Sequence, residues 1–239
     1  MAGLSQRFLN AGYSAPKYML HARGQSIFGH AVGGFAAYFK SCEFMFIVRD
    51  IAQTPAFVQS ECSRLGIKQY RVIIIPSATS GQAETVAIGL RLAHINGDTP
   101  LTIFNIDTFR RNFLTPHNLD LKSIAGYLEV FRGTGNNWSY VAPHATCSGR
   151  VAFTTEKVPV SDLCCTGLYY FSSANLYLQV FDEYSRCAAD KMGLSELYVA
   201  PMYNLLIEDK REVLYHEIER SEVVFCGTPT EYQDFVSAH

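Results

Sequence analysis

Residues 72–107 read VIIIPSATSGQAETVAIGLRLAHINGDTPLTIFNID, and this stretch predicts a strand, a helix and a second strand. We expect the strands over residues 72–75 and 101–106, because short β-branched or apolar runs bounded by turn residues are typical of buried strands. We expect the helix over residues 82–94, since apolar residues recur there at helical spacing. They are Ala83, Val86, Ala87, Leu90 and Ala93. Such alternation indicates an open, largely parallel α/β sheet.

The flanking sequence extends this pattern in both directions. Upstream, residues 44–48 form another apolar run, and Ser26 is suited to cap a helix whose apolar side continues to Phe39. Downstream, short runs separated by turns predict an antiparallel portion. The further expected elements are strands at 126–131, 138–141, 151–156 and 163–171, helices at 174–190 and 195–208, strands at 213–218 and 222–225, and a closing helix from Pro229. We predict a single domain over residues 1–239.

The composition of the chain argues against some classes of partner. The chain has 239 residues, 48% of them hydrophobic and 18% charged, with a formal net charge of -2. This balance supplies no strong field for a nucleic acid partner. No run approaches the ~20 apolar residues of a membrane helix, and residues 1–8 lack the apolar core of a signal peptide. We therefore expect a cytoplasmic protein without a membrane partner, whose seven cysteines are reduced thiols.

The opening segment carries the first candidate chemistry. Residues 2–8 read AGLSQRF and are followed by Pro16 and Lys17. Glycine and small residues let backbone amides approach phosphate oxygens, and Arg7 and Lys17 supply two cations to balance a triphosphate. A solvated turn is an equally good interpretation of this segment taken alone.

Two more candidates follow predicted strands. Glycine at position 81 lets a flat base lie near the backbone, and the Gln82 amide can both donate to and accept from a pyrimidine edge. Gln82 also suits a simple helix start. Asp107 ends the strand at 101–106, where ligands of open parallel sheets bind, so it can hold a hard cation. An acid there can equally form a turn.

The second half offers a charged pair and a glycine. Glu156 and Lys157 stand at the end of one predicted strand, and Thr166 and Gly167 lie inside the next. Adjacent opposite charges usually form a surface feature of little energetic worth. Their alternative role is to bind the hydroxyls and phosphate of a small acceptor.

These segments, in this order, resemble the nucleotidyltransferases that activate sugar phosphates. That family opens with G-x-G-x-R-F/L, a short spacer and P-K, and closes with D-x-G-T-P-E-D-Y, which residues 225–232, FCGTPTEY, resemble. Ser5 stands where the family has a second glycine or a small residue. Two positions depart: Ile106 stands where a glycine usually precedes the metal-binding aspartate, and Phe225 replaces the first closing aspartate, often a second metal ligand. Family members also have an apolar strand before the opening loop, so we expect residues upstream of Met1 or a neighbouring element to replace it.

The resemblance implies a role for each segment. Arg7 would assist the departing pyrophosphate, Lys17 would contact phosphate in the transition state, and Asp107 would bind Mg²⁺. The nucleotide would be bound by Ala2, Gly3, Leu4, Ser5, Gly81 and Gln82. The acceptor would be bound by Glu156, Lys157, Thr166 and Gly167.

The implied fold is a Rossmann-like three-layer α/β fold, an open mixed sheet with helices on both faces. Its nucleotide-binding half would cover about residues 1–125, and a small antiparallel acceptor-binding half about residues 126–239.

The implied reaction is an in-line attack of an acceptor phosphate, such as a sugar phosphate, on the α-phosphorus of a nucleoside triphosphate, with release of pyrophosphate. The product would be a nucleotide-activated precursor for surface polysaccharide synthesis. A lone glutamine favours a pyrimidine, CTP or UTP. Two alternatives stay open: a binding module that has lost turnover, which Phe225 favours, and a glycosyltransferase on the same kind of fold.

Overall fold

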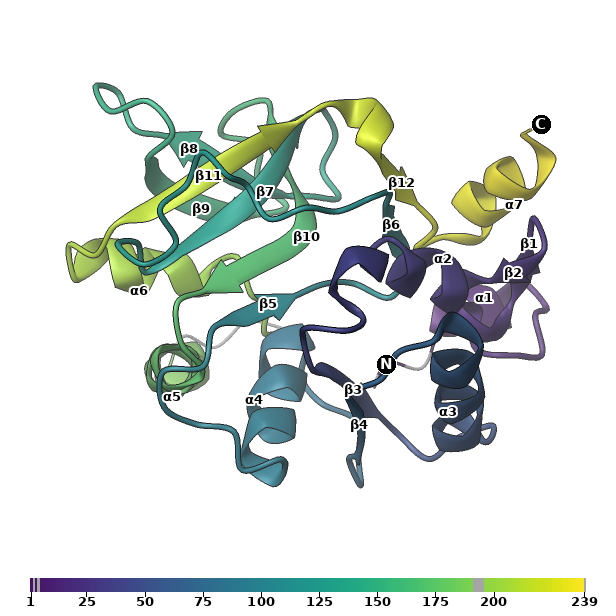
Figure 1. The fold of residues 1–239 in the computed structure, drawn as a ribbon. Helices are drawn as coiled ribbons and strands as arrows, with labels where there is room; N and C mark the ends of the chain where they lie inside the picture. Colours follow the sequence, from purple (N-terminus) through teal and green to yellow (C-terminus); the bar gives the residue numbers. More distant parts are fainter. Residues whose placement is uncertain (2, 4, 191–195, 239) are drawn as a thin grey trace. The chain divides into compact units, whose positions relative to one another are not determined.

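The computed structural model describes residues 1, 3, 5–190 and 196–238 (Figure 1). The chain forms two compact units and passes between them repeatedly. The first unit consists of Met1–Thr79, Asn105–Thr115 and Ser221–His239, and the second of Ser80–Phe104 and Pro116–Arg220. Both units combine helices with strands, which confirms the predicted mixed α/β fold. Of the helices in the described ranges, none is long and apolar enough to cross a membrane.

The first unit contains two short pairs of strands besides a small hairpin. Strand β3 (Phe44–Val48) runs parallel to β4 (Tyr70–Ile74), and β6 (Thr108–Arg110) runs antiparallel to β12 (Val223–Phe225). Its other elements are α1 (Gln6–Asn10), η1 (Lys17–Met19), β1 (His21–Ala22), β2 (Gln25–Ser26), α2 (Ile27–Gly33), η2 (Ala36–Tyr38), α3 (Thr54–Leu65) and α7 (Pro229–Ser237). A short helix η3 (Arg220–Glu222) begins at the boundary between the units. Helix α3 supplies the crossover that two parallel strands require.

Ser26 starts α2, as the sequence predicts. Its Oγ accepts a hydrogen bond from the backbone N of Gly29 at 2.9 Å and donates one to the buried carboxylate of Glu61. The predicted helical face through Phe39 was too long, because α2 ends at Gly33. The carbonyl of Gly34 accepts instead from the backbone N of Phe113 at 2.9 Å.

The second unit is built on a six-stranded mixed sheet in the order β11-β7-β10-β8-β9, with β5 also paired to β10. Only the β11 and β7 pair is parallel among the pairs described in this sheet. The strands are β5 (Leu101–Ile103), β7 (Gly126–Arg132), β8 (Ser139–Pro143), β9 (Val151–Glu156), β10 (Leu163–Phe171) and β11 (Val213–Ile218). The prediction of an antiparallel portion is confirmed, with β9 and β10 at their predicted bounds.

Three helices accompany this sheet: α4 (Gln82–Leu92), α5 (Ala174–Asp190) and α6 (Met202–Glu208). The helix predicted over residues 195–208 is shorter than expected. Residue 195 lies outside the described part of the chain, and the helix begins after Pro201. The strand predicted over residues 101–106 pairs with β10 only as far as Ile103.

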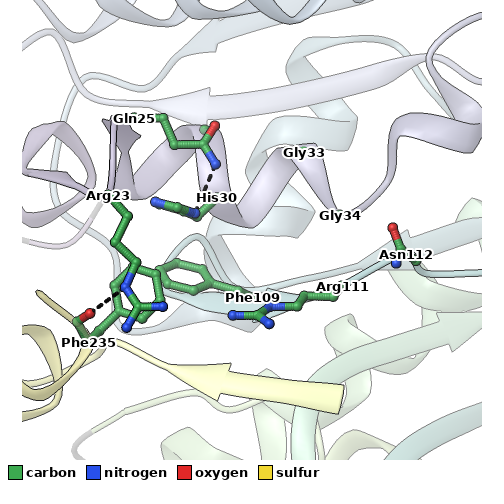
Figure 2. A pocket seen from close by; sticks show the side chains of 10 residues that line it. Arg23, Gln25, His30, Gly33, Gly34, Phe109, Arg111, Asn112 and Phe235 are labelled. Carbon is green, nitrogen blue, oxygen red and sulfur yellow. Dashed lines mark hydrogen bonds between the residues drawn. The ribbon is translucent and has the colours of Figure 1, made fainter. Parts of the chain in front are cut away.

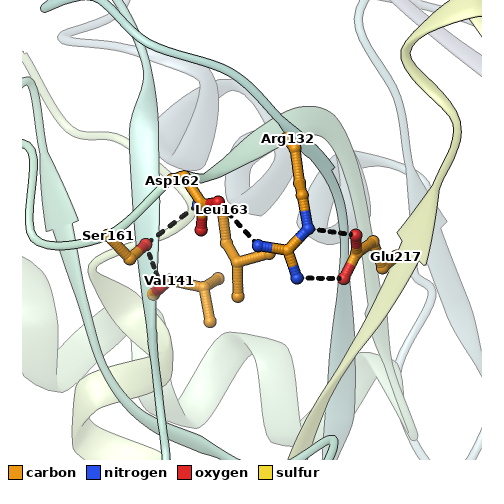
Figure 3. Close-up of polar contacts among 6 residues, drawn as sticks. All are labelled: Arg132, Val141, Ser161, Asp162, Leu163 and Glu217. Carbon is orange, nitrogen blue, oxygen red and sulfur yellow. Dashed lines mark hydrogen bonds and ion pairs between the residues drawn. The ribbon is translucent and has the colours of Figure 1, made fainter.

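Exposed ion pairs join three parts of the second unit (Figure 3). The guanidinium of Arg132, on β7, contacts Asp162 at 2.6 Å and Glu217, on β11, at 2.7 Å. Beside them, the hydroxyl of Ser161 donates to the carbonyl of Val141 at 2.6 Å. Because the Arg132 side chain is 60% exposed, its pairs fix local geometry more than they stabilise the fold.

We expect Ser26→Ala to lower the free energy of unfolding by about 1–3 kcal/mol. The change removes the cap of α2 and leaves the buried Glu61 carboxylate with one donor fewer. Urea unfolding followed by circular dichroism measures the effect, and Ser60→Ala on the exposed side of α3 is the matched control. Equal midpoints for wild type and Ser26→Ala would contradict the expectation.

Candidate active site

The first unit brings Lys17 and Asp107 together from positions 90 residues apart. Lys17 begins the short helix η1, and Asp107 directly precedes β6. The Lys17 Nζ contacts the Asp107 Oδ2 in an ion pair whose side chains are 24% and 19% exposed. Both groups therefore stay reachable from solvent while neutralising each other. The backbone N of Lys17 also donates to the Oγ of Ser5 at 3.3 Å, which ties the opening segment to the pair.

The other residues of the opening segment contribute less to this arrangement. Arg7 lies on α1 with an exposed side chain that makes no hydrogen bond or ion pair within the described residues. Gly3 is exposed. Ala2 and Leu4, predicted to bind the nucleotide, lie outside the described residues. The structure thus joins Lys17, Ser5 and Asp107, but it does not join Arg7 to them.

The closing segment lies against Asp107. The backbone N of Cys226 donates to the Asp107 carbonyl at 2.8 Å, and β12 continues the contact by pairing with β6. A Cβ placed on Gly227 would lie 3.1 Å from the Asp107 Oδ2 and 3.7 Å from the Glu231 Oε2. Burial, together with the nearby Glu231 and Asp107 charges, raises the pKa of Cys226 to about 12. Two carboxylates therefore face the same glycine.

Glu231 is an acid that the sequence analysis missed as a neighbour of Asp107. It forms a capping box with Thr228 at the start of α7: its Oε2 accepts from the Thr228 N at 2.9 Å, and its own N donates to the Thr228 Oγ1 at 3.2 Å. The Thr-x-x-Glu spacing before a helix was the available signal. It predicts the cap, although not the approach to Asp107.

The donor set fits a magnesium ion that takes most of its ligands from a substrate. In the described part of the chain, no group of three or more His, Cys, Asp or Glu residues could hold a metal. Magnesium is usually bound in phosphate-transfer sites by one or two carboxylates together with substrate phosphates and water. Asp107 supplies one such carboxylate, whereas the apolar side chain of Phe225 supplies no ligand.

Gly81 and Gln82 lie in the second unit, at the start of α4. A Cβ at Gly81 would overlap the backbone of Leu197, whose N donates to the Ser80 carbonyl at 2.6 Å. The Gly81 φ of 150° is also one that other residues rarely adopt. The close approach of the Leu197 backbone is a structural reason for glycine at position 81. The predicted contact of Gly81 with a base stays a prediction.

Glu156 and Lys157 come together at the end of β9 with two partners from elsewhere in the second unit. The Ser139 hydroxyl donates to the Glu156 carboxylate, and burial raises the pKa of Glu156. Lys157 has a left-handed backbone with a φ of 59°. Its ammonium contacts the Tyr198 hydroxyl and lies 4.7 Å from the ring centroid. The Tyr198 hydroxyl in turn donates to Glu196 at 2.6 Å.

Thr166 and Gly167 form an irregularity in β10 opposite Glu129. The register with β7 shifts between Cys165 and Tyr169, and Gly167 has a φ of 93°. The Thr166 Oγ1 donates to the Glu129 Oε1 at 3.1 Å. Glu129 is 0% exposed. Sequence analysis missed this carboxylate, for which a lone glutamate in an apolar strand was the only signal.

This chain is similar to proteins of known structure. Neither a scan against protein-family models nor a search of curated proteins finds a match. Among solved structures, the nucleoside-diphosphate-sugar pyrophosphorylase from Vibrio cholerae RC9 is 47% identical to this chain with a TM-score of 0.94. That alignment covers 100% of this chain and 98% of the other.

More distant structures share the fold. The inositol-1-phosphate CTP transferase from T. maritima is 11% identical with a TM-score of 0.68, over 99% of this chain and 92% of the other. A UDP-glucose pyrophosphorylase complexed with UDP-glucose is 13% identical with a TM-score of 0.69, over 98% and 94%. The Rossmann-like fold inferred from the sequence resemblance is thereby confirmed. By its identity to the Vibrio cholerae protein over the full length, this chain belongs to the nucleoside-diphosphate-sugar pyrophosphorylase family.

Proposed function

We propose that this chain transfers a nucleotidyl group from a nucleoside triphosphate to a sugar phosphate and releases pyrophosphate. The observation that carries the proposal is the ion pair between Lys17 and Asp107 beside the opening and closing segments. Family membership supports the same reaction class.

The chemistry requires charge balance and alignment more than a protein nucleophile. An oxygen of the acceptor phosphate, already ionised near neutral pH, attacks the α-phosphorus while the bond to the β-phosphate breaks and pyrophosphate leaves in line. Repulsion between these anions is the main obstacle, so positioned cations lower the barrier. Lys17 exchanges Asp107 for a phosphate oxygen, and Arg7 adds a second cation from α1. When bound by Asp107, magnesium supplies further positive charge at the α-phosphate.

The second unit supplies the acceptor contacts in this proposal. Glu156 accepts hydrogen bonds from acceptor hydroxyls, and Lys157 exchanges the Tyr198 hydroxyl for the acceptor phosphate. Gly167 lets the acceptor approach the backbone at the irregularity of β10, with Thr166 fixed by Glu129. Gly81 and Gln82 hold the base, for which we propose a pyrimidine. The product is a nucleotide-activated sugar of the kind that feeds surface polysaccharide synthesis.

We expect Asp107→Ala and Lys17→Ala each to lower turnover by roughly tenfold to a thousandfold, because each removes charge aligned with the transferred phosphate. The assay measures pyrophosphate release from CTP or UTP with magnesium and mixed sugar 1-phosphates. Lys122→Ala, which removes an exposed lysine of the second unit, is the charge control.

Unchanged rates in soluble Asp107→Ala and Lys17→Ala proteins would refute these assignments. A wild-type protein that binds the triphosphate without releasing pyrophosphate would instead be a binding module, the alternative favoured by Phe225. Release of nucleoside diphosphate from a nucleotide sugar would indicate a glycosyltransferase.

We expect Glu156 to make acceptor binding sensitive to mild acid. Burial raises the pKa of Glu156, so the carboxylate begins to protonate at a higher pH than an ordinary glutamate. The KM for the acceptor should therefore rise as the pH is lowered, and more steeply in the wild type than in Glu156→Gln. In Glu156→Gln the acceptor KM should be high, and its remaining pH dependence should be that of the acceptor's own phosphate group, whose second pKa is about 6. An identical pH profile in wild type and Glu156→Gln would exclude Glu156 from acceptor binding.

A further inference from the structure

A cavity of about 410 Å³ opens in the first unit between α2, β6 and α7 (Figure 2). This volume lies within the range of small-molecule sites. The residues that decide its chemistry are Arg23, His30, Gly33, Phe109, Arg111 and Phe235. Ser5, Lys17 and Asp107 are not among the cavity-lining residues, so the cavity is formed by side chains other than those of the candidate active site.

One wall of the cavity is a cluster of three rings. The His30 ring lies 5.1 Å from that of Phe109 and 5.0 Å from that of Phe235, and the two phenylalanine rings are 5.0 Å apart between centroids. The orientation of His30 is fixed at both nitrogens. Its Nε2 donates to the Ala22 carbonyl at 2.8 Å, and its Nδ1 accepts from the Gln25 side-chain amide at 2.9 Å. The wall is uncharged, and its two phenylalanine rings belong to the core, with Phe109 3% and Phe235 8% exposed.

Two arginines, Arg23 and Arg111, supply positive charge to the same cavity. The Arg23 guanidinium stacks 4.5 Å from the Phe235 ring centroid and donates its Nε–H to the Phe235 carbonyl at 2.8 Å. In Figure 2 the Arg111 side chain runs back toward Phe109. Its guanidinium makes no hydrogen bond or ion pair with the residues that the structure describes. Burial and the charges of Arg111, Arg23 and Arg64 lower the pKa of His30, which keeps the ring neutral.

No carboxylate among the residues lining this cavity balances the two guanidinium groups. Neutral partners leave a guanidinium's charge uncompensated, and phosphate oxygens match its planar fork of donors. A dianion is balanced by two such groups. We propose that this cavity is a second ligand site, which binds a small phosphate-bearing anion, either free phosphate or phosphate esterified to a small ring.

The structure offers a way to close this site without disturbing the fold. Gly33 is the last residue of α2, and a Cβ placed on it meets nothing within 4 Å. A leucine there fills open space on the cavity side. Arg111→Ala removes the guanidinium that has no partner among the described residues, and Arg211→Ala removes an exposed arginine of the second unit as the matched control.

The test is isothermal titration calorimetry of the full chain with inorganic phosphate and, separately, with glucose 1-phosphate. We expect Arg111→Ala and Gly33→Leu to weaken one binding event by roughly tenfold or more, with Arg211→Ala unchanged. Lys17→Ala should retain that event, because Lys17 belongs to the other site. Tighter binding of the ester than of phosphate would show that the site also contacts the group esterified to the phosphate.

Three results would overturn the proposal: no binding of either probe to the wild type, loss of all binding in Lys17→Ala alone, or unchanged binding in Arg111→Ala. If Gly33→Leu does not fold, judged by circular dichroism, Arg111→Ala alone decides. Binding is read without turnover, so the proposed reaction can fail while this site stands, and the reverse also holds.

Discussion

The ion pair of Lys17 and Asp107 depends on three stretches of chain that meet in the first unit. The opening segment holds Lys17 through Ser5, the stretch before β6 supplies Asp107, and the closing segment fixes the Asp107 carbonyl through Cys226. Each partner holds the other in place without substrate. A phosphate can then replace the carboxylate at Lys17 at little cost, because both side chains remain partly solvated.

Local signals predicted the elements that are themselves local. Strands β9 and β10 follow from apolar and β-branched runs, and the helix starts at Ser26 and Pro229 follow from single residues. Helix α3 was not predicted, and its buried positions explain why. Two of them, Thr54 and Glu61, are polar residues facing the interior, so the apolar period is weak. Only the folded chain shows that Ser26 and Arg64 satisfy Glu61.

The residues of the candidate site also differ in whether the sequence alone could identify them. Lys17 and Asp107 could be named from short motifs, since each stands beside a strand or loop of recognisable pattern. Glu129 and Glu231 could not, because their positions depend on a strand irregularity and on the approach of α7 to β6. For Gly81, the motif suggested a function that the structure does not require. Its motif suggested a base contact, yet the backbone of Leu197 alone is enough to require glycine there.

The absence of an acid at Phe225 has a physical consequence for the proposed metal. Glu231 also faces Gly227, but turning toward a cation would break the hydrogen bond that its Oε2 accepts from the Thr228 N, while its own N could still donate to the Thr228 Oγ1. Losing one such hydrogen bond costs about 0.5–1.5 kcal/mol, and bringing the Glu231 carboxylate beside Asp107 adds repulsion whenever no cation is present. Phosphate oxygens of a substrate carry no such cost, because they arrive together with the ion. A single carboxylate at Asp107 therefore favours a metal that binds with the nucleotide over one that is resident before it.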